Sequence, residues 1–89
     1  MSRGARFVFV MKRSAARGLR RCPRRDAILE WLERVCGDPF ATENNVRPLT
    51  GVPRGFRRRF GDWRVSYTVD AEARVIEVFE VELRGGAYR

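Results

Sequence analysis

Residues 55–67, "GFRRRFGDWRVSY", decide the fold of the second half of the chain. Two runs rich in aromatic, β-branched and arginine residues flank the pair Gly61-Asp62, an arrangement typical of a β-hairpin. We therefore expect one strand over residues 55–60 and a second over residues 63–69. A third strand over residues 74–83 follows the next polar turn, and the three strands form an antiparallel meander.

Side chains that alternate along these strands predict which face of the sheet each one occupies. The middle strand has an apolar set that we expect to meet the helices: Trp63, Val65, Tyr67 and Val69. In the last strand, strict alternation groups Phe79 with Val81 and separates both from Ile76 and Val78. On the exposed face we expect four arginines to converge: Arg57, Arg59, Arg64 and Arg84.

The first half of the chain predicts one strand and two helices. Residues 7–11, "FVFVM", form an apolar run of the kind used by a buried strand. Ser14 offers an N-cap to a short basic helix. A second helix starts near Pro23, places Trp31 in the core and ends at "GDP". The segment 40–55 is rich in turn formers, and we interpret it as a connecting loop.

A chain of 89 residues is long enough for one small domain with a single modest core, which we expect to span residues 1–89. The expected fold class is α+β in the order β-α-α-β-β-β. The N-terminal strand and the helical hairpin pack on a small antiparallel sheet.

The net charge is +8, the sequence pI is near 11.1, and only one of the 19 basic residues, Lys12, is a lysine. Arginine makes planar, two-pronged contacts with phosphate, so a basic domain of this kind has a polyanion as its default partner. A GC-rich genome explains arginine in place of lysine. It does not explain the excess of positive over negative charge.

The chain contains no histidine. This excludes histidine-based ribonucleases, Ser-His or Cys-His nucleophiles and Cys/His zinc fingers. Cys22 and Cys36 lack the spacing of a metal or redox motif, and we expect both to be reduced packing residues. We expect no metal site and no cofactor. The N-terminal apolar run is too short for a signal peptide or a membrane span, so we expect a cytoplasmic protein without membrane contact.

Two stretches, "RPLTGVPRGFRRRFGDWRVSYTVD" and "VIEVFEVELRGGAYR", resemble the RelE/ParE superfamily of toxins from bacterial type II toxin–antitoxin modules. The spacing, the turn and the terminal Arg-to-Tyr motif agree together. The resemblance implies a RelE-like fold. For members that cleave messenger RNA it implies a ribosome-dependent endoribonuclease (an mRNA interferase), whose catalytic residues by motif position are Arg64, Arg84 and Tyr88. It implies a set of phosphate-binding arginines: Arg54, Arg57 and Arg59.

This chain departs from the family pattern at several positions. Arginines stand where some relatives have lysines, Leu83 stands where some have a histidine, and Glu82 replaces a small residue. Arginine stays protonated near neutral pH, so Tyr88 and Glu82 are the candidates for proton transfer. Arg58 takes an apolar position of the pattern. Arg64 has a purely structural alternative, an ion pair with Asp62 or Glu80.

Two further functions follow from the same resemblance. A ParE-like member inhibits DNA gyrase and needs no ribonuclease site, and a non-catalytic RelE-fold protein would only bind. The expected partners are the ribosome and messenger RNA, or DNA gyrase in the alternative. In the toxin interpretations we also expect a cognate antitoxin whose acidic segment wraps the domain and covers Arg57, Arg59 and Arg64.

Overall fold

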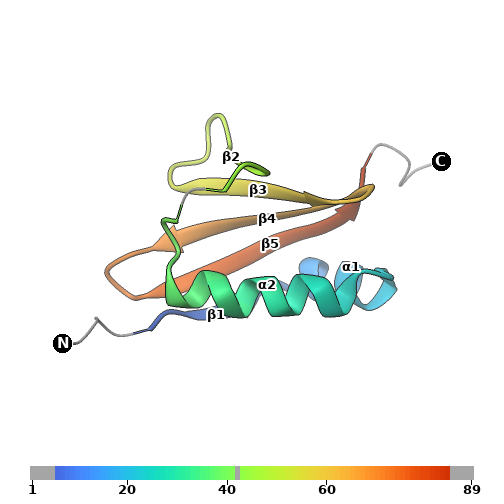
Figure 1. Cartoon of the computed structure of the whole chain (residues 1–89), viewed down its shortest axis with the longest axis horizontal. Helices are drawn as coiled ribbons and strands as arrows, with labels where there is room; N and C mark the ends of the chain where they lie inside the picture. Colours follow the sequence, from blue (N-terminus) through green and yellow to red (C-terminus); the bar gives the residue numbers. More distant parts are fainter. Residues whose placement is uncertain (1–5, 42, 85–89) are drawn as a thin grey trace.

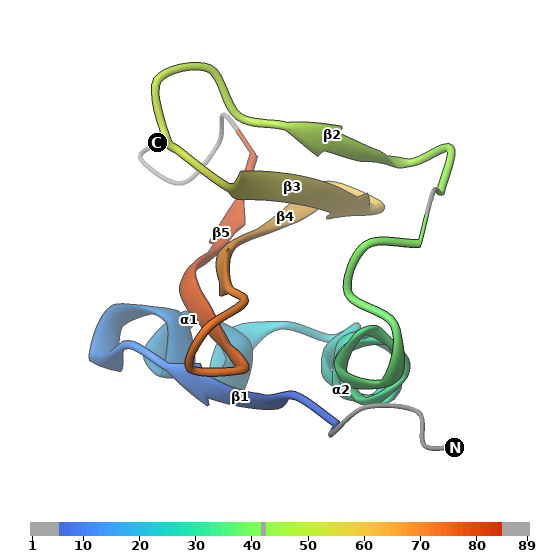
Figure 2. The ribbon, with the colours of Figure 1, turned by 90° about the vertical axis from the view of Figure 1, so that its left-hand side faces the viewer.

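The computed structural model describes residues 6–41 and 43–84. A five-stranded sheet has the order β1-β5-β4-β3-β2, in which β1 pairs parallel with β5 and the other neighbours pair antiparallel. The helices lie near β1 and β5, and β2 and β3 extend beyond them (Figures 1 and 2). The elements in chain order are β1 (Val8–Met11), α1 (Arg13–Arg21), α2 (Arg25–Gly37), β2 (Val46–Pro48), β3 (Gly55–Phe60), β4 (Trp63–Asp70) and β5 (Val75–Leu83).

The expected α+β fold is confirmed, with two helices packed on the sheet, but the sheet differs in two respects from the expectation. It is mixed, because β1 pairs parallel with β5. It also has an additional strand, β2, inside the segment that its turn formers marked as a loop. Three residues of β2 pair with the edge of β3, which is too short a match to leave a periodic pattern in the sequence.

Strand β1 is an edge strand, so the prediction of a buried strand is only half right. Val8 and Val10 are 58% and 47% exposed, whereas Phe9 and Met11 pack against the core. A continuous apolar run predicts burial of both faces. Here the helices cover only one face of β1.

The ends of the helices also differ slightly from the predicted ones. Helix α1 begins at Arg13 with Lys12 as its N-cap, so Ser14 lies inside the first turn. Pro23 lies in the turn before α2, and α2 ends at Gly37 as expected. Among the described helices, none is long and apolar enough to cross a membrane.

Trp31 of α2 is the centre of an aromatic cluster in the core. Its ring lies 5.5 Å from the ring of Phe60 and 5.5 Å from the ring of Tyr67, both edge-on. Trp31 and Tyr67 are 1% and 2% exposed, which confirms both as core residues. Burial raises the pKa of Tyr67 to about 12. Cys22 and Cys36 are buried free thiols, as expected.

Arg58 lies on the helix side of β3, where an apolar residue was expected. Its guanidinium stacks 4.3 Å from the ring centroid of Phe60 and 5.1 Å from that of Trp31. Glu43 lies 3.8 Å from Arg58 and accepts a hydrogen bond from Trp31 Nε1 at 3.4 Å. Burial lowers the pKa of Arg58, and the nearby Glu43 carboxylate opposes that shift. The cation–π contacts and the Glu43 carboxylate thus stabilise the Arg58 charge on the helix side of the sheet.

A β-bulge interrupts the pairing of β4 with β5. Ser66 pairs with Glu80 but Tyr67 pairs with Val78, so Phe79 has no partner on β4. The extra residue reverses the alternation, and Ile76, Val78 and Val81 are all buried. The strict alternation predicted for this strand is therefore wrong, because a bulge shifts the register by one residue.

Helix α1 lies alongside the second half of β5, beyond the residues that pair with β1. A Cβ atom added to Gly18 would lie 1.9 Å from the backbone oxygen of Val81. Only glycine permits this distance between helix and strand.

Gly18→Ala is therefore expected to destabilise the protein by about 1–3 kcal/mol through overpacking. Helix propensity alone predicts the opposite sign, a gain of about 1 kcal/mol. Urea unfolding of the two proteins measures the difference. Gly37→Ala is the control, because its added Cβ meets only the side chain of Arg6. A Gly18→Ala protein as stable as the wild type would contradict the close packing of α1 on β5.

Candidate phosphate-binding site on the sheet

The face of the sheet opposite α2, here called the open face, carries the charged side chains of the meander. Cross-strand pairing arranges five of them, together with Ser66, in two rows across β3, β4 and β5. The first row is Arg57, Ser66 and Glu80, and the second is Arg59, Arg64 and Glu82. The predicted convergence of Arg57, Arg59 and Arg64 on one face is thus present in the structure.

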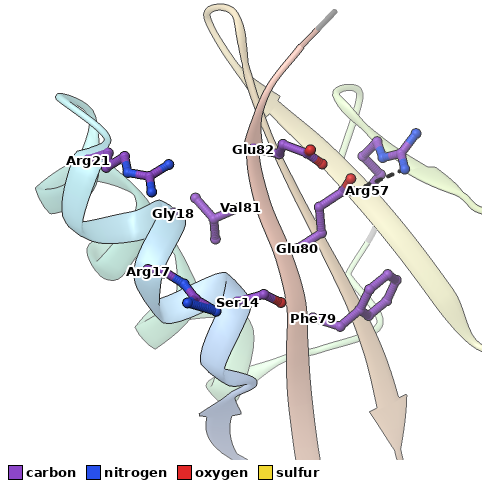
Figure 3. Close-up of a pocket in the computed structure, with 9 residues that line it drawn as sticks. All are labelled: Ser14, Arg17, Gly18, Arg21, Arg57, Phe79, Glu80, Val81 and Glu82. Atoms are coloured by element: carbon purple, nitrogen blue, oxygen red, sulfur yellow. Dashed lines mark hydrogen bonds and ion pairs between the residues drawn. The ribbon is translucent and has the colours of Figure 1, made fainter. Parts of the chain in front are cut away.

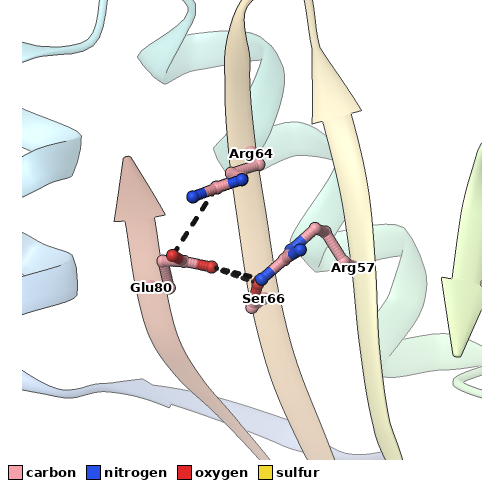
Figure 4. Close-up of polar contacts among 4 residues, drawn as sticks. All are labelled: Arg57, Arg64, Ser66 and Glu80. Carbon is pink, nitrogen blue, oxygen red and sulfur yellow. Dashed lines mark hydrogen bonds and ion pairs between the residues drawn. The ribbon is translucent and has the colours of Figure 1, made fainter. Parts of the chain in front are cut away.

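Glu80 connects the three strands through its carboxylate (Figure 4). One oxygen accepts from Ser66 Oγ at 2.5 Å and from Arg57 Nη2 at 3.1 Å, and Arg57 Nε donates to Ser66 Oγ at 2.9 Å. Ser66 is 0% exposed, and this pair of contacts satisfies its hydroxyl as both donor and acceptor. The network holds the Arg57 guanidinium in one orientation over the face.

Arg64 is held more loosely. Its Nε lies 3.6 Å from Glu80 Oε2, which is within ion-pair range but too long for a hydrogen bond. Arg64 Nε is buried and has no hydrogen-bond partner among the described residues. The structural alternative that the sequence left open is therefore present with Glu80 as the acceptor. The Arg64 side chain as a whole is 31% exposed, so N–H groups of its guanidinium other than the buried Nε can reach an incoming anion.

Two carboxylates of β5, Glu80 and Glu82, have pKa values displaced in opposite directions. Burial alone would raise the pKa of Glu80, but hydrogen bonds with Glu82 and Ser66 and the charges of Arg57 and Arg64 lower it overall. The pKa of Glu82 is raised, first by sharing a hydrogen bond with Glu80 and then by slight burial and the Glu80 charge. Glu80 is thus the ionised partner of the arginines, and Glu82 is the more easily protonated of the two.

Two grooves lie on the open face, and Arg57 and Phe79 line both. The wider has a volume of about 920 Å³ and contains three arginines, Arg47, Arg57 and Arg59, with no acidic side chain in its lining. Arg47 lies directly opposite Arg57 across the β2–β3 pair. The narrower groove, of about 460 Å³, lies between α1 and β5 (Figure 3).

The remaining predicted site residues are Arg84, Arg54 and Tyr88, which are not among the six paired positions. Arg84 follows β5 with an exposed side chain, and its backbone N–H donates to the carbonyl of Asp62 at 2.6 Å. Arg54 lies in the turn before β3, where its carbonyl accepts from the N–H of Val69, so it is at the opposite end of the hairpin from Arg64. Tyr88 lies outside the described residues. The catalytic and phosphate-binding roles of these residues stay predictions.

Sequence reasoning missed several residues of these grooves. Arg47 was inside an expected loop, Ser66 was assigned only by alternation, and Phe79 was placed on the wrong face because the bulge was not foreseen. Glu80 was named only as a possible partner of Arg64. Among residues 6–41 and 43–84, no group of three His, Cys, Asp or Glu side chains is arranged to hold a metal ion.

Residues 9–88 match the family model described as the ParE toxin of the type II toxin–antitoxin system, parDE. Three solved structures are similar in fold. The archaeal RelE–RelB complex from Pyrococcus horikoshii OT3 is 26% identical with a TM-score of 0.73, and the match covers 90% of this chain and 96% of that one. The intact E. coli RelBE toxin–antitoxin complex is 25% identical with a TM-score of 0.72, and the match covers 96% of this chain and 100% of that one. The YoeB/ParE toxin from Agrobacterium tumefaciens is 20% identical with a TM-score of 0.74, and the match covers 88% of this chain and 99% of that one. No curated protein sequence matches the chain significantly.

The lowered pKa of Glu80 predicts that this residue makes the free energy of unfolding depend on pH. Because the folded pKa lies below the unfolded value, its contribution is complete above that value and is lost as pH falls through the folded pKa. The relevant window lies below about pH 4.3, the ordinary pKa of an unfolded glutamate.

Glu80→Gln is expected to lower the free energy of unfolding at pH 7 by about 1–3 kcal/mol, the value of hydrogen bonds to a charged group. The loss should shrink as pH falls below about 4.3. Urea unfolding between pH 7 and 3 measures both effects, with the exposed Glu72→Gln as the control for a lost charge. If the difference in unfolding free energy between wild type and Glu80→Gln does not change with pH, an ionised Glu80 in the network is contradicted.

Proposed function

The chain belongs to the family of ParE toxins of type II toxin–antitoxin systems, and on this premise we propose that it is a toxin that cleaves messenger RNA on the ribosome. Its resemblance to RelE-like toxins implies this activity, which inhibits translation in the cytoplasm. The observation that carries the proposal is the wide groove on the open face, lined by three arginines and by no carboxylate. Such a groove suits the phosphodiester backbone of a nucleic acid.

The proposed reaction is attack of a ribose 2′-hydroxyl on the adjacent phosphodiester. Negative charge builds on the phosphate oxygens during the attack, and fixed guanidinium groups stabilise it. Arg57 is pre-oriented by Ser66 and Glu80, and the partly exposed Arg64 lies on the neighbouring strand. These two residues are the proposed charge-stabilising pair, while Arg47 and Arg59 hold the backbone on either side.

Proton transfer needs a different kind of group, because arginine does not release its proton near neutral pH. Tyr88 is the proposed residue for this step. Arg84, next to the end of β5, is the proposed contact to the leaving group.

The test is translation-dependent cleavage. Purified protein is added to a cell-free translation reaction, and new messenger RNA ends are mapped by primer extension with and without ongoing translation. Arg57→Ala and Arg64→Ala are each expected to reduce cleavage by about 100-fold or more, as loss of one charge-stabilising donor does in other enzymes. Arg20→Ala is the matched control, because it removes an exposed arginine outside both grooves.

Cuts that persist unchanged in Arg57→Ala and Arg64→Ala would overturn the site. Intact RNA with a folded wild-type protein would overturn the nuclease. Growth that is unaffected by expression of the protein alone would instead favour a non-catalytic member of the fold.

A second function, inhibition of DNA gyrase, is favoured by a separate observation. The chain has no histidine and its single lysine is Lys12, outside the open face's arginine rows. Inhibition requires a binding surface and no proton transfer. Relaxed plasmids or gyrase-linked DNA breaks after induction, with messenger RNA intact, would select this function.

We propose that a cognate antitoxin restrains the toxin through an acidic segment placed over Arg57, Arg59 and Arg64. The similar Pyrococcus horikoshii and E. coli structures are complexes with the antitoxin RelB, which supports the existence of such a partner. The net charge of +8 favours an acidic one.

The triple variant Arg57→Gln/Arg59→Gln/Arg64→Gln is expected to bind the antitoxin more weakly and with a smaller dependence on salt, because fewer ion pairs form. Calorimetry at several salt concentrations measures both quantities. A control triple variant at exposed helix positions, Arg13→Gln/Arg20→Gln/Arg34→Gln, removes the same charge elsewhere. Equal affinities and equal salt slopes for the two triple variants would show that the antitoxin does not cover the open face.

A further inference from the structure

Phe79 is a large apolar side chain on a charged face. The bulge turns it away from the helices, and it is neither a member of the core cluster nor one of the side chains packed against that cluster. It lies beside Arg57 and lines both grooves of the open face. Bulges beside functional sites commonly re-aim a side chain. Packing does not explain the position of this ring, whereas a ligand with a flat apolar surface would.

The narrower groove offers an exposed carboxylate, Glu82, in the same lining as that ring. Glu80 is occupied by Ser66, Arg57 and Arg64, but Glu82 has no ion pair among the described residues. Figure 3 shows Glu82 projecting from β5 on the same side as Glu80 and Phe79. An exposed carboxylate in the same groove as an aromatic ring provides a hydrogen-bond acceptor for the edge of a base that stacks on the ring.

The opposite wall of the groove is basic. Arg17 and Arg21, one helical turn apart on α1, line it together with Ser14 (Figure 3). Neither arginine has an ion pair within the part of the chain that the structure describes. The close approach at Gly18 fixes this wall relative to β5. The groove therefore combines a ring, an acceptor and two guanidinium groups in about 460 Å³.

We propose that the groove between α1 and β5 binds one unpaired nucleotide of the RNA, with Phe79 stacking on the base, Glu82 reading its edge and Arg17 and Arg21 holding its phosphate. The proposal rests on the proposed function, because it assumes that the substrate is RNA. Single-stranded RNA is recognised in this manner, by stacking on aromatic rings and by hydrogen bonds to base edges.

The carboxylate of Glu82 selects guanine among the four bases. The Watson–Crick edge of guanine carries two adjacent donors, N1–H and N2–H, which one carboxylate accepts in parallel. Adenine, cytosine and uracil each present one donor beside an acceptor, and that acceptor faces the second carboxylate oxygen unfavourably. A two-pronged contact of this kind discriminates between bases by about tenfold or more.

The experiment measures binding without cleavage. Four labelled heptaribonucleotides, identical except for a central G, A, C or U in a uridine background, are titrated with the protein and followed by fluorescence anisotropy. The wild type is expected to bind the G oligonucleotide about tenfold more tightly than the other three. Glu82→Gln should lose this preference while binding all four at least as tightly as the wild type binds the U oligonucleotide, because a negative charge is removed. Glu72→Gln removes an exposed charge elsewhere and should keep the preference.

Phe79→Leu is expected to weaken binding of all four oligonucleotides by about tenfold, the usual effect of losing one stacking ring. Its urea unfolding should match the wild type, because Phe79 is outside the core cluster. An unchanged preference in Glu82→Gln, unchanged affinity in Phe79→Leu, or no oligonucleotide binding by the wild type would each overturn the nucleotide site. Failure of the proposed function is distinguished by the translation assay: cuts mapped there with no base preference leave the nuclease intact and remove only this inference.

Discussion

The bulge at Phe79 is the constraint on which both the core and the open face depend. Before it, Ile76 and Val78 face the helices, and after it Val81 does so again. Without the extra residue, a strand that keeps Ile76 and Val78 in the core would turn Val81 away from the core and point Glu80 into it. A buried carboxylate without partners is far more costly than an interrupted ladder. The bulge therefore lets one strand serve a continuous apolar core and a charged face.

The network around Glu80 follows from that placement. Glu80 faces Ser66 across the β4–β5 pair, and Ser66 faces Arg57 across the β3–β4 pair. A small hydroxyl in the middle strand leaves room for the carboxylate and the guanidinium to meet above it. The hydrogen bonds that satisfy the buried Ser66 hydroxyl also hold the Arg57 guanidinium in its orientation. Pre-oriented donors of this kind stabilise developing charge without reorganisation.

The sequence predicted those parts of the fold that depend on local signals. The Gly61-Asp62 turn and uninterrupted alternation fixed the β3–β4 hairpin, so the common face of Arg57, Arg59 and Arg64 was correct. Features set by tertiary context were not predictable from periodicity. A bulge leaves no composition signal in "VIEVFEVEL", and β2 exists only through its pairing with β3. Arg58 violates the apolar pattern because Phe60 of the same strand and two residues from elsewhere in the chain, Trp31 and Glu43, surround its charge.

The distribution of carboxylates divides the arginines of this face into two classes. Arg57 and Arg64 share Glu80, so an anion that approaches them competes with an internal carboxylate as well as with water. Arg47 and Arg59 line a groove without acidic residues, where attraction for a polyanion is not opposed locally. A flexible polyanion would therefore gain most of its affinity from the wide groove. In the proposed reaction, the arginines around Glu80 would bind a phosphate more strongly only as its negative charge increases. The proposed function therefore assigns binding to Arg47 and Arg59 and charge stabilisation to Arg57 and Arg64.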